Sequence, residues 1–162
     1  MQPFEYHAPT SIRGAVELLA TLNGRARALA GGTDLLVKLR LGALSADHVV
    51  DLKRIPETTR ILFDARQGLT VGAAVPCAEI CEHREARRRY PALVDAASLI
   101  GGAAIQGRAT LGGNLCNAAP SADGAAALVA LDARCLVAGP RGRRWIPAAD
   151  FCTAPGRTAL AE

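Results

Sequence analysis

A chain of 162 residues with 50% apolar content is long enough to bury one substantial core, which excludes a disordered protein. Its net charge of +4 comes almost wholly from arginine, since Lys38 and Lys53 are its only lysines. The two arginine-rich runs, HREARRRY and GPRGRRW, accompany no nucleic-acid-binding motif. We therefore expect them to form solvated faces or a surface for an acidic partner subunit, with no nucleic acid partner.

The first 55 residues predict a small lobe of the βαβ type. An extended opening segment precedes a helix that begins at Thr10 or Ser11 and ends at an Asn-Gly pair. The run RARALAGG then predicts a short buried strand, and Thr33 is placed to cap a short helix over 34–41. HVVDLKRI predicts a second strand. Residues 1–55 are thus expected to form the N-terminal lobe.

The remaining residues, 56–162, predict a larger lobe in which helices pack on an antiparallel sheet, so the fold class is α+β. Ser121 is expected to cap one of these helices, and FCTAPGRTALAE to form a polar loop. The expected elements in order are a hairpin of 61–63 against 69–75, helices over 77–84 and 91–99, the segment ATLGGN, a helix over 122–131, the strand RCLVAG, an arginine-rich turn and RWIPAADF.

The five cysteines are an odd number, and from this sequence we expect neither a signal peptide nor an apolar run long enough to cross a membrane. We therefore expect free thiols in a reducing cytoplasm and no membrane span. Cys77 and Cys81, followed by His83, lack a second pair that would complete a metal site, so no metal is expected. No partners are recognisable for His7, His48 and His83, and no catalytic residue can be named.

Two Gly-Gly segments, AGGTDLL and ATLGGNLCN, lie about 80 residues apart. Consecutive glycines let backbone N–H groups converge on an anion, and a following helix adds unpaired donors. Two such loops would suit a diphosphate, although neither has the G-x-G-x-x-G spacing. The residues alone leave a plain turn and a phosphate site about equally open. Asp123 is either a helix-dipole partner or an acceptor for ligand hydroxyls.

The motifs AGGTDLL and ATLGGNLCNAAPSAD, with the opening FEYHAPTSIRGAVELL and the run FCTAPGRTAL, resemble the FAD-binding medium subunit of molybdenum hydroxylases. That family includes the flavoprotein subunits of carbon monoxide and xanthine dehydrogenases. The resemblance covers essentially the whole chain and implies a two-lobed PCMH-type fold with FAD between the lobes. The cofactor-binding residues that it implies are Leu29, Ala30, Gly31, Gly32, Thr33, Asp34, Leu35, Ile100, Gly101, Ala109, Thr110, Gly113, Asn114, Cys116, Asn117 and Asp123.

The resemblance also implies a role as the electron outlet of a complex. A large subunit with the molybdenum cofactor and a small [2Fe-2S] subunit would complete a heterotrimer, which can dimerise. Electrons from the clusters would pass through FAD to NAD⁺, a quinone or O₂. The alternatives are a non-catalytic assembly module of the same complex and a flavin oxidoreductase that works alone. Family members are far longer, so we expect this chain to lack the last strands around the flavin and the C-terminal domain.

Overall fold

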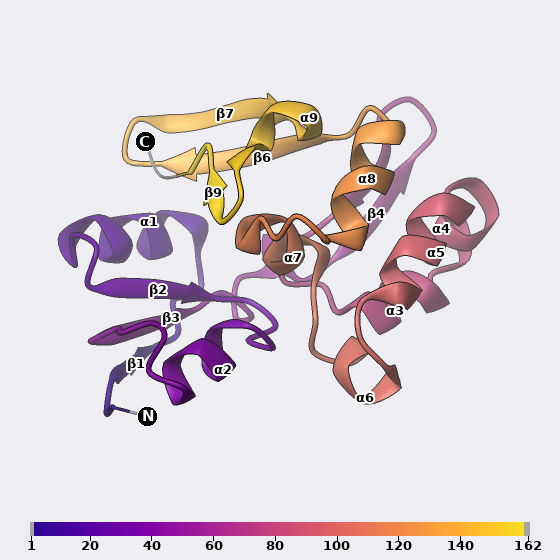
Figure 1. The fold of residues 1–162 in the computed structure, drawn as a ribbon. Helices are drawn as coiled ribbons and strands as arrows, with labels where there is room; N and C mark the ends of the chain where they lie inside the picture. The colour runs from indigo at the N-terminus through magenta and orange to yellow at the C-terminus, as the bar shows by residue number, and fades with distance from the viewer. Residues whose placement is uncertain (1, 161–162) are drawn as a thin grey trace.

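The computed structural model describes residues 2–160, and its N-terminal part is a three-stranded sheet flanked by two helices (Figure 1). Its elements are β1 (Glu5–His7), α1 (Ile12–Thr21), β2 (Ala26–Leu29), α2 (Leu35–Arg40) and β3 (His48–Asp51). β3 lies between β1 and β2 and pairs with both in parallel. Parallel neighbours require crossover connections, which α1 and α2 supply. We call residues 2–55 the sheet lobe.

Local signals in the sequence set the ends of α1. Its N-cap is Ser11, whose hydroxyl accepts a hydrogen bond from the Gly14 backbone N–H at 3.1 Å. After the helix, Asn23 and Gly24 both take positive φ angles, of 41° and 79°, which turns the chain into β2. The expected strand–helix–strand order is confirmed. Thr33 was expected to cap the next helix, but the N-cap of α2 is Asp34, which makes no side-chain capping bond.

Residues 56–160 form what we call the helical lobe, which consists of short helices and three hairpins, with the β6–β7 hairpin along the upper edge of the view (Figure 1). Its first elements are the 3₁₀ turn η1 (Pro56–Thr58), the hairpin β4 (Ile61–Asp64) and β5 (Gly68–Val71), and the helices α3 (Cys77–Glu82), α4 (Arg84–Arg89), α5 (Pro91–Leu99), α6 (Ala103–Gln106), α7 (Leu111–Asn117) and α8 (Asp123–Ala130). Its last elements are β6 (Arg134–Gly139), β7 (Gly142–Pro147), α9 (Ala148–Phe151), β8 (Cys152–Ala154) and β9 (Arg157–Thr158).

The α+β fold class is confirmed, but several details of the helical lobe differ from expectation. Among the described residues its strands pair only as three separate two-stranded hairpins, and a single antiparallel sheet does not form. The expected arginine-rich turn is present at Pro140 and Arg141, although Arg143 and Arg144 already belong to β7. The expected polar loop contains the β8–β9 hairpin. The helix expected to be capped by Ser121 has Ala122 as its N-cap, without a side-chain bond.

The largest correction concerns the second Gly-Gly pair. Gly112 and Gly113 were expected in a loop, yet both lie in the first turn of α7. The Thr110 hydroxyl caps this helix by accepting from the Gly113 N–H at 2.9 Å. At its other end Ala118 takes a left-handed conformation with φ 46°, which stops the helix. A good cap at each end allows a seven-residue helix to include two glycines, whose helix propensity is low.

The largest apolar cluster of the helical lobe packs against the start of α7. It joins the start of α7 to α3, α4 and α5. Its buried members are Val75, Cys77, Ile80, Ala86, Leu93, Ala97, Ala109 and Leu111. Fully burying a side chain such as that of Ile80 contributes about 1.5–3 kcal/mol. Within residues 2–160, no helix combines the length and the apolar character needed to cross a membrane.

Candidate functional site

The two Gly-Gly segments meet where the sheet lobe contacts the helical lobe. The loop from β2 to α2 lies so close to the chain entering α7 that a Cβ atom on Gly31 would lie 2.1 Å from the Arg108 carbonyl oxygen. It would also lie 3.1 Å from the Cα atom of Ala109. Only a residue without a side chain permits this approach. The structure therefore brings together the two segments that the sequence analysis paired, and Gly31 is the contact.

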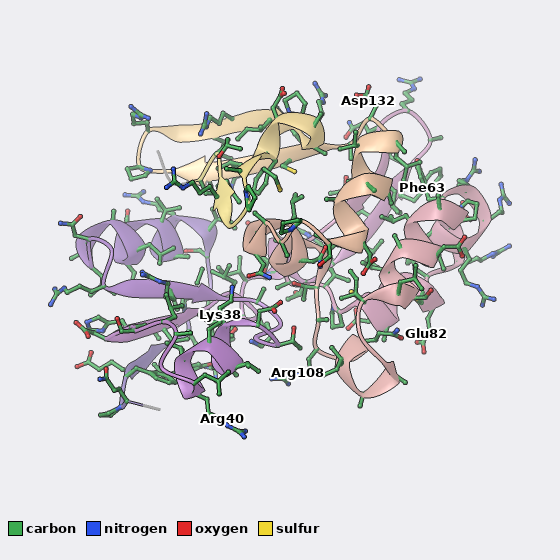
Figure 2. The ribbon with its side chains drawn as sticks, viewed as in Figure 1. Lys38, Arg40, Phe63, Glu82, Arg108 and Asp132 are labelled. Carbon is green, nitrogen blue, oxygen red and sulfur yellow. The ribbon has the colours of Figure 1, made fainter. Side chains whose placement is uncertain are left out.

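A side-chain bond joins the same two segments. Lys38, on α2, donates from its Nζ atom to the Oδ1 atom of Asn117, at the end of α7. Figure 2 shows Lys38 extending from α2 towards α7. Asn117 is one of the residues expected to bind the cofactor, and in this structure its amide oxygen accepts the bond across the junction.

The rest of the first segment is shaped by backbone constraints. Gly32 has a φ angle of +85°, and a Cβ atom there would also contact the Leu29 and Leu36 side chains. Its carbonyl accepts the hydrogen bond from the Leu36 N–H that opens α2. Within the described chain, the backbone N–H groups of Thr33 and Asp34 have no intramolecular acceptor. These two donors, at the start of a short helix, are free for an anionic ligand.

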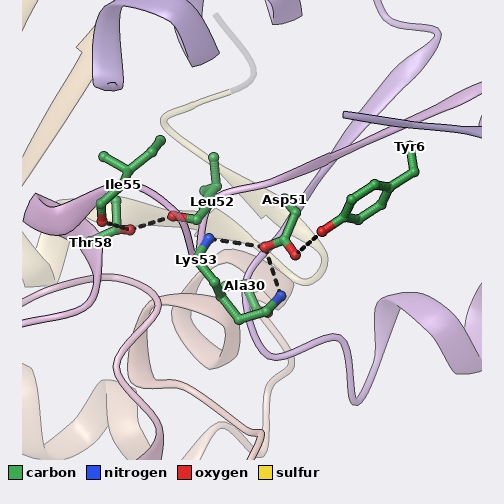
Figure 3. A network of polar contacts seen from close by, with 7 residues as sticks. All are labelled: Tyr6, Ala30, Asp51, Leu52, Lys53, Ile55 and Thr58. Atoms are coloured by element: carbon green, nitrogen blue, oxygen red, sulfur yellow. Dashed lines mark hydrogen bonds and ion pairs between the residues drawn. The ribbon is translucent and has the colours of Figure 1, made fainter. Parts of the chain in front are cut away.

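A polar network that the sequence analysis missed fixes the position of the loop between β2 and α2 (Figure 3). Lys53 donates from its Nζ atom to the Ala30 carbonyl oxygen at 2.9 Å and to the Asp51 carboxylate at 2.7 Å. Asp51 also accepts from the Tyr6 hydroxyl at 2.6 Å and from the Lys53 backbone N–H at 2.9 Å. The end of β3 is thus tied to the carbonyl that precedes Gly31. The sequence signal that could have indicated this network is the spacing Asp-x-Lys at Asp51 and Lys53, at the end of a predicted strand.

The net effect of this network on Asp51 is to stabilise its charged form. Burial works to raise the pKa of Asp51, because it removes the carboxylate from water. Hydrogen bonds from Lys53 and Tyr6 outweigh burial and hold the pKa below its ordinary value. The same bond to Asp51 raises the pKa of the Tyr6 hydroxyl, because Tyr6 donates it. Asp51 therefore stays ionised at neutral pH and keeps Lys53 directed at the loop.

The two glycines of the second segment have different surroundings. A Cβ atom on Gly112 would lie 2.5 Å from the Ala73 carbonyl oxygen and 2.7 Å from its Cα atom, so packing on the β5–α3 connection requires glycine there. A Cβ atom on Gly113 would meet within 4 Å only the Thr110 hydroxyl, at 2.9 Å. Among the described residues, no backbone from outside α7 lies within 4 Å of this Cβ position. Its missing side chain leaves open one face of the first turn of α7.

Asn114 carries a polar atom without a partner. Its Oδ1 atom is buried, and it is the one buried side-chain nitrogen or oxygen among the described residues without a hydrogen bond. It faces the first turn of α8, where a Cβ atom on Gly124 would lie 2.9 Å away. A buried acceptor without a donor costs about 1–3 kcal/mol. Such an atom fits a site in which a ligand supplies the donor.

The other predicted residues lie around this junction with varied exposure. Ala109 and Thr110 are buried, and the Thr110 hydroxyl is used as the cap of α7. Ile100 packs against the core of the helical lobe, and Gly101, with φ +68°, is exposed beside Ile105. Asp123 begins α8 and is exposed, as is Cys116. Leu29 and Leu35 pack in the core of the sheet lobe.

Cys77, Cys81 and His83, which lie close together in the sequence, each make a local structural contact. All five cysteines are free. Burial raises the pKa of Cys77 to about 11, so this thiol is neutral and packs as a small apolar group. Cys81 directs its thiol at the Val94 carbonyl, and the Nδ1 atom of His83 accepts from the Ala86 N–H to cap α4. These three residues do not gather as a metal site.

A groove of about 600 Å³ lies between α1 and the turn of the β6–β7 hairpin. Its lining includes Arg13, Glu17 and Arg143. None of the predicted cofactor residues contributes to it. The junction of the two Gly-Gly segments, rather than this groove, is therefore the candidate site.

Comparison with known proteins places these features in a family. Residues 2–162 match the model of the FAD binding domain in molybdopterin dehydrogenase. The chain is 38% identical over 155 residues to the xanthine dehydrogenase FAD-binding subunit of Escherichia coli O157:H7, covering 96% of this chain and 53% of that protein. It is 35% identical over 159 residues to the carbon monoxide dehydrogenase medium chain of Hydrogenophaga pseudoflava, covering 98% of this chain and 55% of that one.

The solved structures agree with the sequence relatives. A carbon monoxide dehydrogenase from Hydrogenophaga pseudoflava, lacking the Mo-pyranopterin moiety of its cofactor, superposes with a TM-score of 0.94 at 35% identity. The match covers 99% of this chain and 56% of that one. The chain thus spans about half the length of the curated relatives that it matches.

Proposed function

Because this chain belongs to the family of FAD-binding domains of molybdopterin dehydrogenases, we propose that it is the flavin-binding part of the medium subunit of a molybdenum hydroxylase complex. Membership confirms the family expected from the two Gly-Gly motifs, and with it FAD as the cofactor. Its relatives are named as subunits of xanthine and carbon monoxide dehydrogenases. In the proposed role, electrons arrive from a [2Fe-2S] subunit, and a molybdenum subunit oxidises the substrate.

The observation that carries the proposal is the buried, unpartnered Oδ1 atom of Asn114 on α7, the helix whose first turn also has the open face at Gly113. FAD carries a diphosphate, which accepts hydrogen bonds, and ribityl hydroxyls, which donate them. The residues fit both needs, because Thr33 and Asp34 offer free N–H donors and Asn114 offers a free acceptor. When bound, FAD accepts and releases electrons, and in our proposal NAD⁺, a quinone or O₂ takes them.

Each part of the junction has its own task in this proposal. Lys53, positioned by Asp51, donates to the Ala30 carbonyl and so fixes the loop whose N–H groups bind the diphosphate. Gly113 leaves room for the cofactor to approach α7. Asn114 orients it by accepting from a hydroxyl, and Asp123 is placed to accept from another. Free cysteines suit a reducing compartment, which we propose to be the cytoplasm.

Substitution of Asn114 tests the proposal directly. Asn114→Leu removes the unpartnered acceptor and keeps the number and branching of the side-chain heavy atoms, so the free energy of unfolding is expected to stay equal or to rise by about 1 kcal/mol. FAD retention after reconstitution and desalting is expected to fall about tenfold or more, because the ligand loses its acceptor. Gln67→Leu, which replaces an exposed amide in the β4–β5 turn, is the control and should keep FAD. Unchanged retention in Asn114→Leu would contradict the assignment.

Two further outcomes separate the alternatives. A chain that co-purifies with molybdenum and [2Fe-2S] subunits but holds no FAD would be an assembly module. A yellow chain that is active without partners would be an independent flavin oxidoreductase. The proposed function requires both retained FAD and reduction of that FAD by the [2Fe-2S] subunit, measured as bleaching of the flavin absorbance.

A further inference from the structure

A cluster of three metal-ligating side chains lies on the sheet lobe, formed by Glu5, His7 and His48. Glu5 and His7 are two residues apart on β1, so their side chains point to the same face of the sheet. β1 pairs in parallel with β3 in a register that sets Glu5 opposite His48. The pairing of two strands that are 41 residues apart therefore creates this cluster.

The spacing of the three ligand atoms matches that of a tetrahedral metal site. The Nε2 atom of His7 lies 3.1 Å from the Nδ1 atom of His48. The Oε2 atom of Glu5 lies 3.3 Å from that Nδ1 atom and 3.7 Å from the Nε2 atom. Tetrahedral Zn²⁺ with bonds of about 2.1 Å would hold its ligand atoms about 3.4 Å apart. The three observed distances bracket this value.

The donor set selects the kind of ion. Two imidazole nitrogens and one carboxylate oxygen suit Zn²⁺ and its transition-metal neighbours, whereas Mg²⁺ and Ca²⁺ take oxygen ligands. The His48 side chain is 14% exposed and that of His7 28%, so both are held in place by their surroundings. The Glu5 side chain is 73% exposed, which leaves an entry from solvent and room for water as a fourth ligand.

We propose that Glu5, His7 and His48 bind one Zn²⁺ ion and that the ion fastens the edge strand β1 to β3. β1 has only three residues and pairs on one side, so few hydrogen bonds hold it in the sheet. The unfolded chain does not assemble the three ligands, so the ion binds the folded state and stabilises it by mass action. This role is independent of FAD, because none of the three residues belongs to the junction of the Gly-Gly segments.

The test is a titration of the chelator-treated chain with ZnCl₂, followed by calorimetry and thermal unfolding. We expect one bound ion per chain and a melting temperature that rises with Zn²⁺ but not with Mg²⁺. His48→Ala and His7→Ala should each weaken Zn²⁺ binding at least about tenfold, and Glu5→Gln should weaken it less. His83→Asn, which alters a histidine outside the cluster and retains an N-cap residue, should bind Zn²⁺ as the unaltered chain does.

The free cysteines make a thiolate site the main competing explanation of any binding. Co²⁺ in place of Zn²⁺ distinguishes them, because a cysteine ligand produces a thiolate charge-transfer band and the proposed ligands do not. That band, or Zn²⁺ affinity unchanged in folded His48→Ala, would overturn the proposal. Should either histidine variant fail to fold, Glu5→Gln decides, since its exposed side chain is not needed for packing and unchanged affinity there would also overturn it.

Discussion

The two Gly-Gly segments share a pair of glycines in the sequence but have different backbone conformations in the structure. The first, Gly31-Gly32, is a loop that needs one close backbone contact and one positive φ angle. The second, Gly112-Gly113, is a helical turn in which Gly112 packs on Ala73. Three of the four glycines are thus explained by the fold of the chain itself. Gly113 has no close backbone neighbour from outside its own helix among the described residues, so its missing side chain is the one that function must explain.

The largest effect should come from the contact between the segments. In Gly31→Ala the new methyl group would overlap the Arg108 carbonyl, so the loop or α7 must shift. We expect the free energy of unfolding to fall by about 3 kcal/mol, at the upper end for an overpacked site. Urea unfolding measures it. Gly107→Ala is the matched control, because Gly107 has helical φ and ψ and nothing within 4 Å, and a loss there as large as at Gly31 would refute the contact argument.

A substitution at Gly113 should separate ligand binding from folding. Gly113→Val places a side chain on the open face of α7 and displaces only the Thr110 hydroxyl. We expect FAD affinity to fall about a hundredfold, equivalent to about 2.7 kcal/mol, while far-UV circular dichroism is preserved. The free energy of unfolding should fall by only about 0.5–2 kcal/mol, because displacing the Thr110 hydroxyl weakens the cap of α7, whereas valine and glycine are both weak helix formers. Loss of the fold would make Gly113 a structural requirement like Gly112.

The polar network of Tyr6, Asp51 and Lys53, which holds the first Gly-Gly segment, predicts that the free energy of unfolding depends on pH. The pKa of Asp51 is lowered on folding, so its ionised form contributes stability above about pH 4, and this is lost as the pH falls through the folded pKa. Asp51→Asn should lower the free energy of unfolding at pH 7 by about 2 kcal/mol, because it removes charge-assisted bonds from Lys53 and Tyr6. Urea unfolding from pH 7 to pH 3 should show a shallower decline in the variant than in the parent. Parallel declines would contradict this account.

Local signals were sufficient for most elements of the fold. The Ser11 cap, the Asn-Gly stop and the alternation of β6 act within a few residues, so the sequence displays them. α7 was missed because two glycines disfavour a helix. The contact of Gly112 with Ala73 that favours the helix is a tertiary one, which the local sequence does not show. In the same way, the expected single sheet could not be tested from the sequence, since pairing between hairpins depends on distant residues.

The candidate site was predicted as a pair of motifs but not as a geometry. The resemblance named the residues, and the meeting of Gly31 with Arg108 brings the two segments together. The supporting Lys53 and Asp51, and the orphan acceptor of Asn114, depend on side-chain packing that no motif encodes. The cluster of Glu5, His7 and His48 was missed for a related reason, because its members meet only through the register of β1 and β3.

The smallest effect should come from the side-chain bond across the junction, and its size decides what holds the two segments together. Lys38→Met keeps the apolar stem and removes the donor to Asn117. Because this bond is exposed, its loss should cost about 0.5 kcal/mol in urea unfolding, far less than the Gly31 contact. Freed from Lys38, the Asn117 amide could instead serve the cofactor, so FAD affinity should stay equal or rise. A loss of stability as large as that of Gly31→Ala would mean that side chains, and not the close backbone approach, join the lobes.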